Sequence, residues 1–247
     1  MSTSLTDPKY YAVVEATWPT AAKRQLGPIT LREGQGGGQR VSAATALAKA
    51  SAADLPVAEE AMREMGQRPL FMIRPCDQTL DALLEARGYA IHDPVRAWVC
   101  PPQTLMDQPV PRVTVFAIWE PLAMMREIWE AGGIGPGRQA VMDRAQGPKT
   151  ALLGRWKEKP AAAAFVAIHD GVAMLHALEV LPHQRRQGMA QWMMRAAAFW
   201  AAENGADTLA VLCTQANGPA NGLYASLSMK PVTEYHYRHK PEETASS

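Results

Sequence analysis

The feature that most constrains the fold is an order of elements that occurs twice along the 247-residue chain. The first copy consists of RVSAATAL, a helical pattern, PLFMIR, a second helical pattern and an extended segment. The second copy consists of VAMLHALEV, a helical pattern, TLAVLC, a second helical pattern and an extended segment. Few residues are shared between the copies, so the repeat is one of element order. It predicts two similar α/β (α+β) units in tandem, each a mixed sheet with flanking helices.

Further elements are predicted around this repeat. A helix is expected over Pro8–Trp18, and two strand-like runs flank the glycine-rich stretch Gly34–Gly38. The second copy is preceded by a strand, two helices and a strand hairpin with the following sequences: VTVFAIW, PLAMMREIWEAGG, GRQAVMDRAQ, TALLGRW and AAAAFVAI. Prolines cluster between Cys100 and Pro111, which marks a linker. We therefore expect domains at residues 1–103 and 113–247, joined by residues 104–112.

Composition narrows the function classes. The chain is 47% hydrophobic and 20% charged, as in soluble globular proteins, and its net charge of +1 favours neither nucleic acid nor an anionic membrane as partner. MSTSLTDPKYY lacks the pattern of a signal peptide, and apolar stretches stop short of the roughly 18 residues that span a bilayer. Cys76, Cys100 and Cys213 form no CxxC pair, so we expect reduced, buried thiols, no metal site and a cytoplasmic location.

The stretch LEVLPHQRRQGMAQWMMRAAAFW, residues 178–200, passes from a strand-like segment through a basic turn into a helix. The first amides of a helix lack internal partners and carry partial positive charge, so they bind phosphate where small residues allow close approach. Gly188 and Ala190 are small, and Arg185 and Arg186 add positive charge. A pyrophosphate cradle is the functional hypothesis, and a solvated basic turn is the alternative. No P-loop motif occurs, and Gly34–Gly38 is better explained as a hairpin than as a dinucleotide fingerprint.

The C-terminal part of the chain resembles the GNAT superfamily of acetyl-CoA-dependent N-acetyltransferases. The segment Arg185–Ala190 fits the family's Q/R-x-x-G-x-G/A loop, and Asn217, Ala220 and Leu223-Tyr224 fit its N-x-x-A-x-x-L-Y motif. Ser228-Met229 departs from the Gly-Phe that usually closes that motif, which weakens the turn signature only.

The resemblance implies a GNAT fold, acetyl-CoA as cosubstrate and a set of residues that bind it. The strand end would pair with the pantetheine arm, with the Val180 N–H on the thioester carbonyl; the turn would hold the diphosphate, and Asn217 would bind the arm. These expected cofactor-binding residues are Leu178, Glu179, Val180, Arg185, Arg186, Gln187, Gly188, Met189, Ala190, Gln191 and Asn217. Helix capping is the alternative role for Asn217.

Two residues are candidates for proton transfer. By resemblance, Tyr224 is the general acid toward the leaving sulfur, with a packing tyrosine as the alternative. LHALEV is similar to a strand of arylalkylamine N-acetyltransferases, in which a histidine at the position of His176 carries off the amine's proton; a structural histidine is the alternative. Period-two alternation puts His176 and Val180 on one face unless a bulge intervenes, and it counts against Glu179, the alternative base.

The first half has acidic residues in SAADLPVAEEA where the second has its basic turn. We therefore expect it to bind no CoA, to support the catalytic sheet and to wall the acceptor site. Arg32 and Arg40 flank the glycines; we expect them to be solvated, and contact with an acidic group is the alternative.

The sequence thus predicts an N-acetyltransferase that acts on a small-molecule or peptide amine by direct attack in a ternary complex. A non-catalytic acyl-CoA-binding module and a nucleotide-binding protein are the rival hypotheses. The identity of the amine and the oligomeric state stay open.

Overall fold

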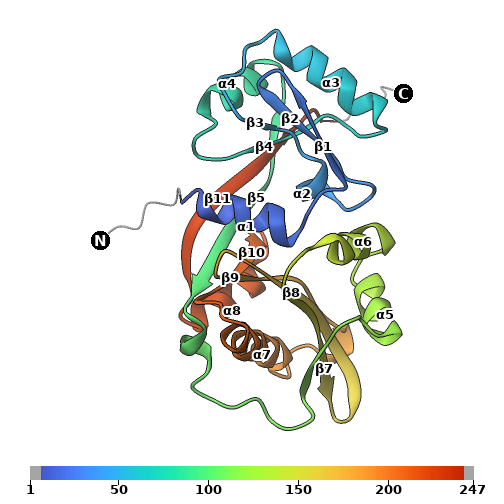
Figure 1. The fold of residues 1–247 in the computed structure, drawn as a ribbon, viewed down its shortest axis with the longest axis vertical. Helices are drawn as coiled ribbons and strands as arrows, with labels where there is room; N and C mark the ends of the chain where they lie inside the picture. Colours follow the sequence, from blue (N-terminus) through green and yellow to red (C-terminus); the bar gives the residue numbers. More distant parts are fainter. Residues whose placement is uncertain (1–6, 242–247) are drawn as a thin grey trace.

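The computed structural model describes residues 7–241 (Figure 1). Residues 1–6, which open the segment inspected for a signal peptide, lie outside this part. The helices are α1 (Lys9–Thr17), α2 (Gln39–Ser42), α3 (Asp54–Glu64), α4 (Gln78–Ala86), α5 (Ala123–Ala131), α6 (Pro136–Arg144), α7 (Met189–Glu203) and α8 (Gly218–Ser226). The strands are β1 (Ala22–Leu26), β2 (Ile29–Glu33), β3 (Thr45–Ala46), β4 (Leu70–Ile73), β5 (Ala90–Cys100), β6 (Val115–Ile118), β7 (Lys149–Trp156), β8 (Lys159–His169), β9 (Val172–Val180), β10 (Thr208–Thr214) and β11 (Lys230–His239).

The strands form two sheets. A small sheet has the order β1-β2-β3, and an eight-stranded sheet has the order β4-β11-β5-β10-β9-β8-β7-β6. Most of the large sheet is antiparallel, whereas β9 and β10 pair in parallel. The predicted tandem arrangement of mixed sheets with flanking helices is confirmed (Figure 1).

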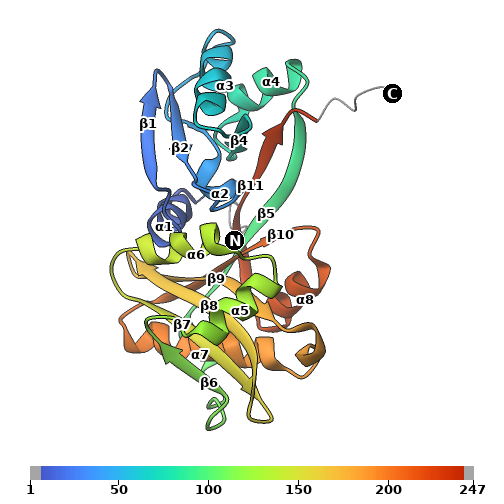
Figure 2. The same ribbon diagram turned by 90° about the vertical axis from the view of Figure 1, so that its right-hand side faces the viewer.

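The two copies exchange their last strands. β5 closes the first copy but lies between β10 and β11 of the second, antiparallel to both. β11 closes the second copy but lies between β5 and β4 of the first, again antiparallel to both. One sheet therefore runs through both copies, and the long β5 and β11 cross between the upper and lower parts in Figure 2. The division at residues 104–112 stays a prediction.

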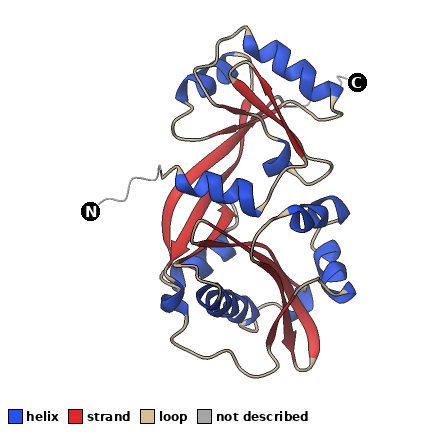
Figure 3. Cartoon of the chain, in the orientation of Figure 1, coloured by secondary structure: helices blue, strands red, loops and turns tan. Residues whose placement is uncertain are grey.

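Helices cover both faces of the sheet in the second copy (Figure 3). Strand β8 is buried on both sides, and alternate residues belong to different cores. Ala162, Ala164 and Val166 lie in the core formed with α7, whereas Ala163, Phe165 and Ala167 lie in the core formed with α5 and α6. The alanines let helices approach the sheet closely from either side.

Helix α1 joins the two copies. It is the first element of the chain, yet Tyr10, Val13 and Val14 pack against Val172 and Met174 of β9 in the second copy. Because of this packing, the end of α1 lies next to the strand that carries His176.

Most predicted elements are present, but three expectations are wrong. RVSAATAL is not one strand: α2 covers its first residues, and only Thr45–Ala46 pairs with β2. Strand β1 was missed because its sequence, AKRQL, is polar and almost fully exposed, which leaves no hydrophobic pattern. Cys76 is exposed rather than buried, although Cys100 and Cys213 are buried and all three are free.

No helix in the described part of the chain is long and apolar enough to cross a membrane.

Candidate active site

A large groove opens where β9 and β10 separate. Their parallel pairing ends at Leu175 and Val211, whereas β9 stays paired with β8 as far as Val180. The groove between the diverging ends has a volume of about 1190 Å³. Its lining includes twelve residues expected from the sequence: His176, Leu178, Glu179, Val180, Arg185, Arg186, Gly188, Met189, Ala190, Gln191, Asn217 and Tyr224. Gln187 is the one expected residue outside this lining.

A β-bulge in β9 changes which side chains share a face. The register shifts between the pairs Ala163–Glu179 and Phe165–His176, so β9 carries one more residue than β8 across this interval. Ala177 has a φ of +52°, and its carbonyl accepts a hydrogen bond of 2.9 Å from Trp129 Nε1. The expectation that His176 and Val180 share a face is therefore wrong. The bulge puts Glu179 on the His176 face instead, so parity no longer counts against Glu179.

The backbone of Val180 faces the groove. Leu181 N–H donates to Ala161 O over 2.9 Å, which makes this facing pair a hydrogen-bonded one. Hydrogen-bonded and non-hydrogen-bonded pairs alternate in an antiparallel ladder, so Val180, opposite Ala162, directs its N–H and C=O away from β8. The strand on that other side is β10, which has already diverged. The Val180 N–H is thus available to a group in the groove.

One end of the groove is the start of α7. Gly188 is its N-cap and has a φ of +77°, a left-handed conformation that disfavours residues with a side chain. Within residues 7–241, no acceptor is assigned to the backbone N–H groups of the five residues Arg186–Ala190. Backbone donors without partners at the positive end of a helix favour an anion nearby.

The two arginines of the turn have different roles in the fold. Arg185 Nε donates to Val180 O over 3.0 Å and Nη2 to Glu179 Oε1 over 3.0 Å, so this side chain ties the turn to β9. Arg186 forms no ion pair within the described residues, and its backbone has a φ of +62°. Arg186 is therefore the arginine of the pair whose charge is free for an anion.

Asn217 caps helix α8. Its Oδ1 accepts a hydrogen bond of 3.2 Å from Ala220 N–H. The capping role considered from the sequence is thus present, and the Nδ2 donors are left for the groove.

Tyr224 lies on α8 and is 5% exposed. Burial raises its pKa, so the phenol stays protonated at neutral pH. Its hydroxyl has no hydrogen-bond partner among the described residues, and the side chain lines the groove beside Cys213. Burial also raises the pKa of the Cys213 thiol, to about 11.

His176 is held by partners from the first copy. Arg40 Nη1 lies 3.2 Å from Nδ1, and Thr17 Oγ1 lies 2.8 Å from Nε2. An arginine only donates, so Nδ1 accepts and Nε2 carries the proton that is donated to Thr17 Oγ1; that hydroxyl in turn donates to Val13 O over 2.7 Å. Burial, and then the charge of Arg40, hold the pKa of His176 well below its usual 6.5.

Near His176, the groove is lined by several residues that were not expected from the sequence. Arg40, Ile134 and Arg138 line it together with His176. Arg40 had been expected in solvent, yet α2 turns it toward His176 and the Trp18 ring. Arg32 is likewise buried, in an ion pair with Glu15. The only sequence signal for these residues was the position of Arg32 and Arg40 next to the glycines. Their burial could not be predicted, because it depends on how α1 packs.

Comparison with known proteins agrees with this architecture. Residues 119–229 match the model of the acetyltransferase (GNAT) family. These residues form a GNAT domain.

Two solved structures are similar over nearly the whole chain. A GCN5-related N-acetyltransferase from Kribbella flavida superposes with a TM-score of 0.69 at 20% identity, over 96% of each chain. A tandem GNAT protein from the clavulanic acid biosynthesis pathway superposes with a TM-score of 0.59 at 13% identity, over 95% of this chain and 88% of the other. Both likenesses concern the fold.

A likeness in sequence covers a shorter part. The Bacillus subtilis (strain 168) protein "Uncharacterized N-acetyltransferase YobR" is 29% identical over 104 residues. The match spans 42% of this chain and 42% of that relative.

Proposed function

We propose that this protein is an N-acetyltransferase that transfers the acetyl group of acetyl-CoA to a primary amine by direct attack in a ternary complex. The GNAT domain supports the reaction class. The observation that carries the proposal is the run of five backbone N–H groups, Arg186–Ala190, to which no acceptor is assigned among the described residues. Four of these residues, all but Gln187, line the groove.

The groove suits an elongated donor with an anionic end. The amides of Arg186–Ala190 would bind the diphosphate, and Gly188 leaves open space for its approach. The pantetheine arm would lie between β9 and β10, where Asn217 Nδ2 and the Val180 backbone have donors to offer. The Val180 N–H would polarise the thioester carbonyl and stabilise the oxyanion that develops on it.

Among the described residues of the first copy, the corresponding helix start carries a carboxylate. At the start of α3, Asp54 Oδ2 accepts hydrogen bonds from Ser51 N (2.7 Å) and Ser51 Oγ (2.6 Å). A carboxylate in this position repels phosphate, so we propose that only the second copy binds CoA.

Tyr224 is the proposed acid. As the amine nitrogen bonds to the acetyl carbon, the carbon–sulfur bond breaks and negative charge moves to sulfur. A hydroxyl whose pKa is raised by burial donates a hydrogen bond to that thiolate. The protonated Cys213 thiol offers no nucleophile, which favours direct attack over an acetyl-enzyme.

The amine's proton requires an acceptor. We keep His176 as the proposed base, since its Nδ1 lies at the acceptor end of the groove. Arg40 occupies that lone pair, so the base acts only when this hydrogen bond opens. Glu179 is the alternative base, and its carboxylate forms an ion pair with Arg185.

Turnover and binding together test this proposal. We expect CoA to bind and acetylated product to form with a panel of amines, and Tyr224→Phe to lower kcat by about 10²-fold with little change in CoA affinity. Tyr10→Phe, at a core position on α1, is the matched control and should leave kcat unchanged.

The outcomes separate the rival hypotheses. CoA binding without turnover of any amine would make the protein a non-catalytic acyl-CoA-binding module. Equal kcat in Tyr224→Phe and wild type would remove Tyr224 as the acid.

A further inference from the structure

A second cavity adjoins the acceptor end of the groove and has a volume of about 280 Å³. The two cavities share Arg40, Ile134, Arg138, His176, Ala177 and Thr214. The remaining wall comes largely from the first copy and from the exchanged strands, and includes Trp18, Val95 and Tyr237. A molecule in this cavity therefore lies beside His176 and in line with the groove.

Arg40 is a partly buried cation without a carboxylate partner. Of its donors, Nη1 reaches His176, whereas Nε is buried and has no partner. The guanidinium lies 5.9 Å from the Trp18 ring centroid. It forms no ion pair with any residue in the described part of the chain. Burying an uncompensated charge is costly, which points to a counterion that comes from outside the protein.

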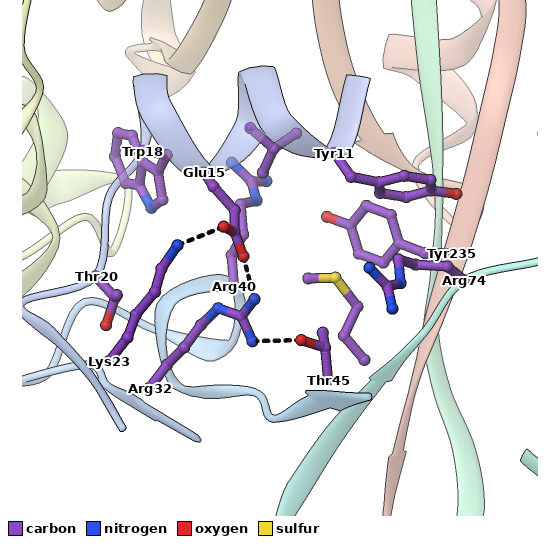
Figure 4. Close-up of a pocket in the computed structure, with 12 residues that line it drawn as sticks. Tyr11, Glu15, Trp18, Thr20, Lys23, Arg32, Arg40, Thr45, Arg74 and Tyr235 are labelled. Carbon is purple, nitrogen blue, oxygen red and sulfur yellow. Dashed lines mark hydrogen bonds and ion pairs between the residues drawn. The ribbon is translucent and has the colours of Figure 1, made fainter. Parts of the chain in front are cut away.

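The groups around Arg40 do not supply that counterion. Figure 4 shows Glu15 between Lys23 and Arg32, which hold its carboxylate. Tyr237 and His176 are neutral, because burial raises the pKa of the former and lowers that of the latter. The Tyr235 hydroxyl is buried without a hydrogen-bond partner among the described residues, and it lines the neighbouring cavity of Figure 4.

A second guanidinium faces the same cavity. Arg138 of α6 is exposed and, like Arg40, forms no ion pair within residues 7–241. Its Nε packs against Gly38, where an added Cβ would lie 3.0 Å away. Asp93 is the one acidic residue in this lining, and its carboxylate lies 3.1 Å from His92 Nε2. Among the described residues of its lining, the cavity thus presents two guanidinium groups without an ion pair and one carboxylate, that of Asp93.

We propose that this cavity binds the oxyanion of the acceptor, so that the substrate class is a small primary amine that also carries a carboxylate, phosphate or phosphonate. Arg40 and Arg138 would bind the oxyanion through paired N–H donors, and the amine would point toward His176 and the groove. Trp18, Val95 and Ile134 supply an apolar wall for the carbon skeleton. This inference rests on the proposed function and names its acceptor.

Matched acceptors test it. Phenylalanine, phenylalaninamide, phenethylamine and 1-amino-2-phenylethylphosphonate share a side chain and differ in the oxyanion, and a second set can be built on alanine. We expect kcat/KM, corrected for the fraction of free amine, to be about 10- to 100-fold higher for members with an oxyanion. The member with the higher kcat/KM, carboxylate or phosphonate, shows which type of oxyanion the cavity prefers.

Variants connect this preference to the two arginines. Arg138→Gln changes an exposed side chain and Arg40→Gln a partly buried one, and each should lower the ratio of kcat/KM between acid and amide. Arg24→Gln, on exposed β1, is the matched control and should keep the ratio. The ratio is the decisive readout, because a changed pKa of His176 would alter both acceptors alike.

The inference is overturned if acid and amide give equal kcat/KM, or if both variants keep the wild-type ratio; in either case acetyl transfer itself still stands. If no member of either set is acetylated, calorimetry of the CoA-bound protein decides. Binding of phenylacetate or phenylphosphonate that is lost in Arg138→Gln supports the inference, and no binding of either at millimolar concentration contradicts it. Loss of CoA binding would instead count against the proposed function.

Discussion

The hydrogen bond from Arg40 to His176 decides what the histidine can do. It fixes the tautomer, occupies the Nδ1 lone pair and adds a positive charge that disfavours protonation. His176 is therefore neutral at neutral pH, and its Nδ1 can accept a proton only when the hydrogen bond from Arg40 opens. Burial raises the pKa of Tyr224, the proposed acid, and keeps its hydroxyl protonated. At the scale of single residues, the proposed acid is thus protonated and the proposed base is neutral.

Stability should depend on pH through His176. Below about pH 6.5 the unfolded chain binds a proton here that the folded chain does not, so stability is complete above that pH and falls by up to about 1.4 kcal/mol per pH unit below it. The stability that His176→Gln loses relative to wild type should thus be larger at about pH 7.5 than at about pH 5.5. Urea unfolding of both proteins measures this difference, with exposed His169→Gln as control. A loss that grows toward acidic pH would contradict the assigned neutral state.

At the scale of elements, the groove depends on a bulge. Ala177 has a φ of +52° in the middle of β9, and Trp129 holds its carbonyl. The bulge brings Glu179 onto the face of His176 while the backbone of Val180 turns toward the groove. In a strand with regular alternation, His176 would share its face with Val180 and not with Glu179.

Glycine should therefore be tolerated at this position. An alanine in the left-handed region is strained by roughly 1–2 kcal/mol, so Ala177→Gly should leave stability unchanged or raise it slightly. Ala173→Gly, in the regular and buried part of β9, should lower it by about 1 kcal/mol or more. Urea midpoints of the two variants measure the contrast, and equal losses would show that the bulge carries no strain.

At the scale of the whole molecule, the exchange of β5 and β11 makes the two copies interdependent. Each copy takes its neighbouring strands from the other, and α1 of the first copy packs on β9 of the second. The first copy therefore contributes residues to the proposed acceptor site and packs against the sheet that forms it.

Separated halves should not fold. Residues 1–103 and 113–247 produced alone would expose unpaired edges, and we expect neither to unfold cooperatively in urea. Mixed together, they should recover one cooperative transition. Two separate transitions, one for each isolated half, would show that the copies are independent domains.

Much of this molecule was predictable from its sequence, because helices and strands have local periodicity. The turn at Gly188, the cap Asn217 and the strand with His176 fell where the pattern put them. The exchange of β5 and β11 was not predictable, since pairing between distant strands leaves no local signal. The bulge at Ala177 and the burial of Arg40 were missed for the same reason: both depend on tertiary contacts, with Trp129 and with Trp18.

The central claim is that backbone amides at the start of α7 bind the diphosphate of CoA, and one comparison tests it most directly. Gly188 and Gly205 lie at opposite ends of α7, have φ of +77° and +80°, and each has open space around an added Cβ. Aspartate at either position introduces the same charge and similar backbone strain, but only at Gly188 does the carboxylate face the proposed phosphate site. Calorimetric titration with CoA should show binding to wild type and Gly205→Asp, and a loss of at least about 100-fold in Gly188→Asp. Equal affinity in the two variants would contradict the account.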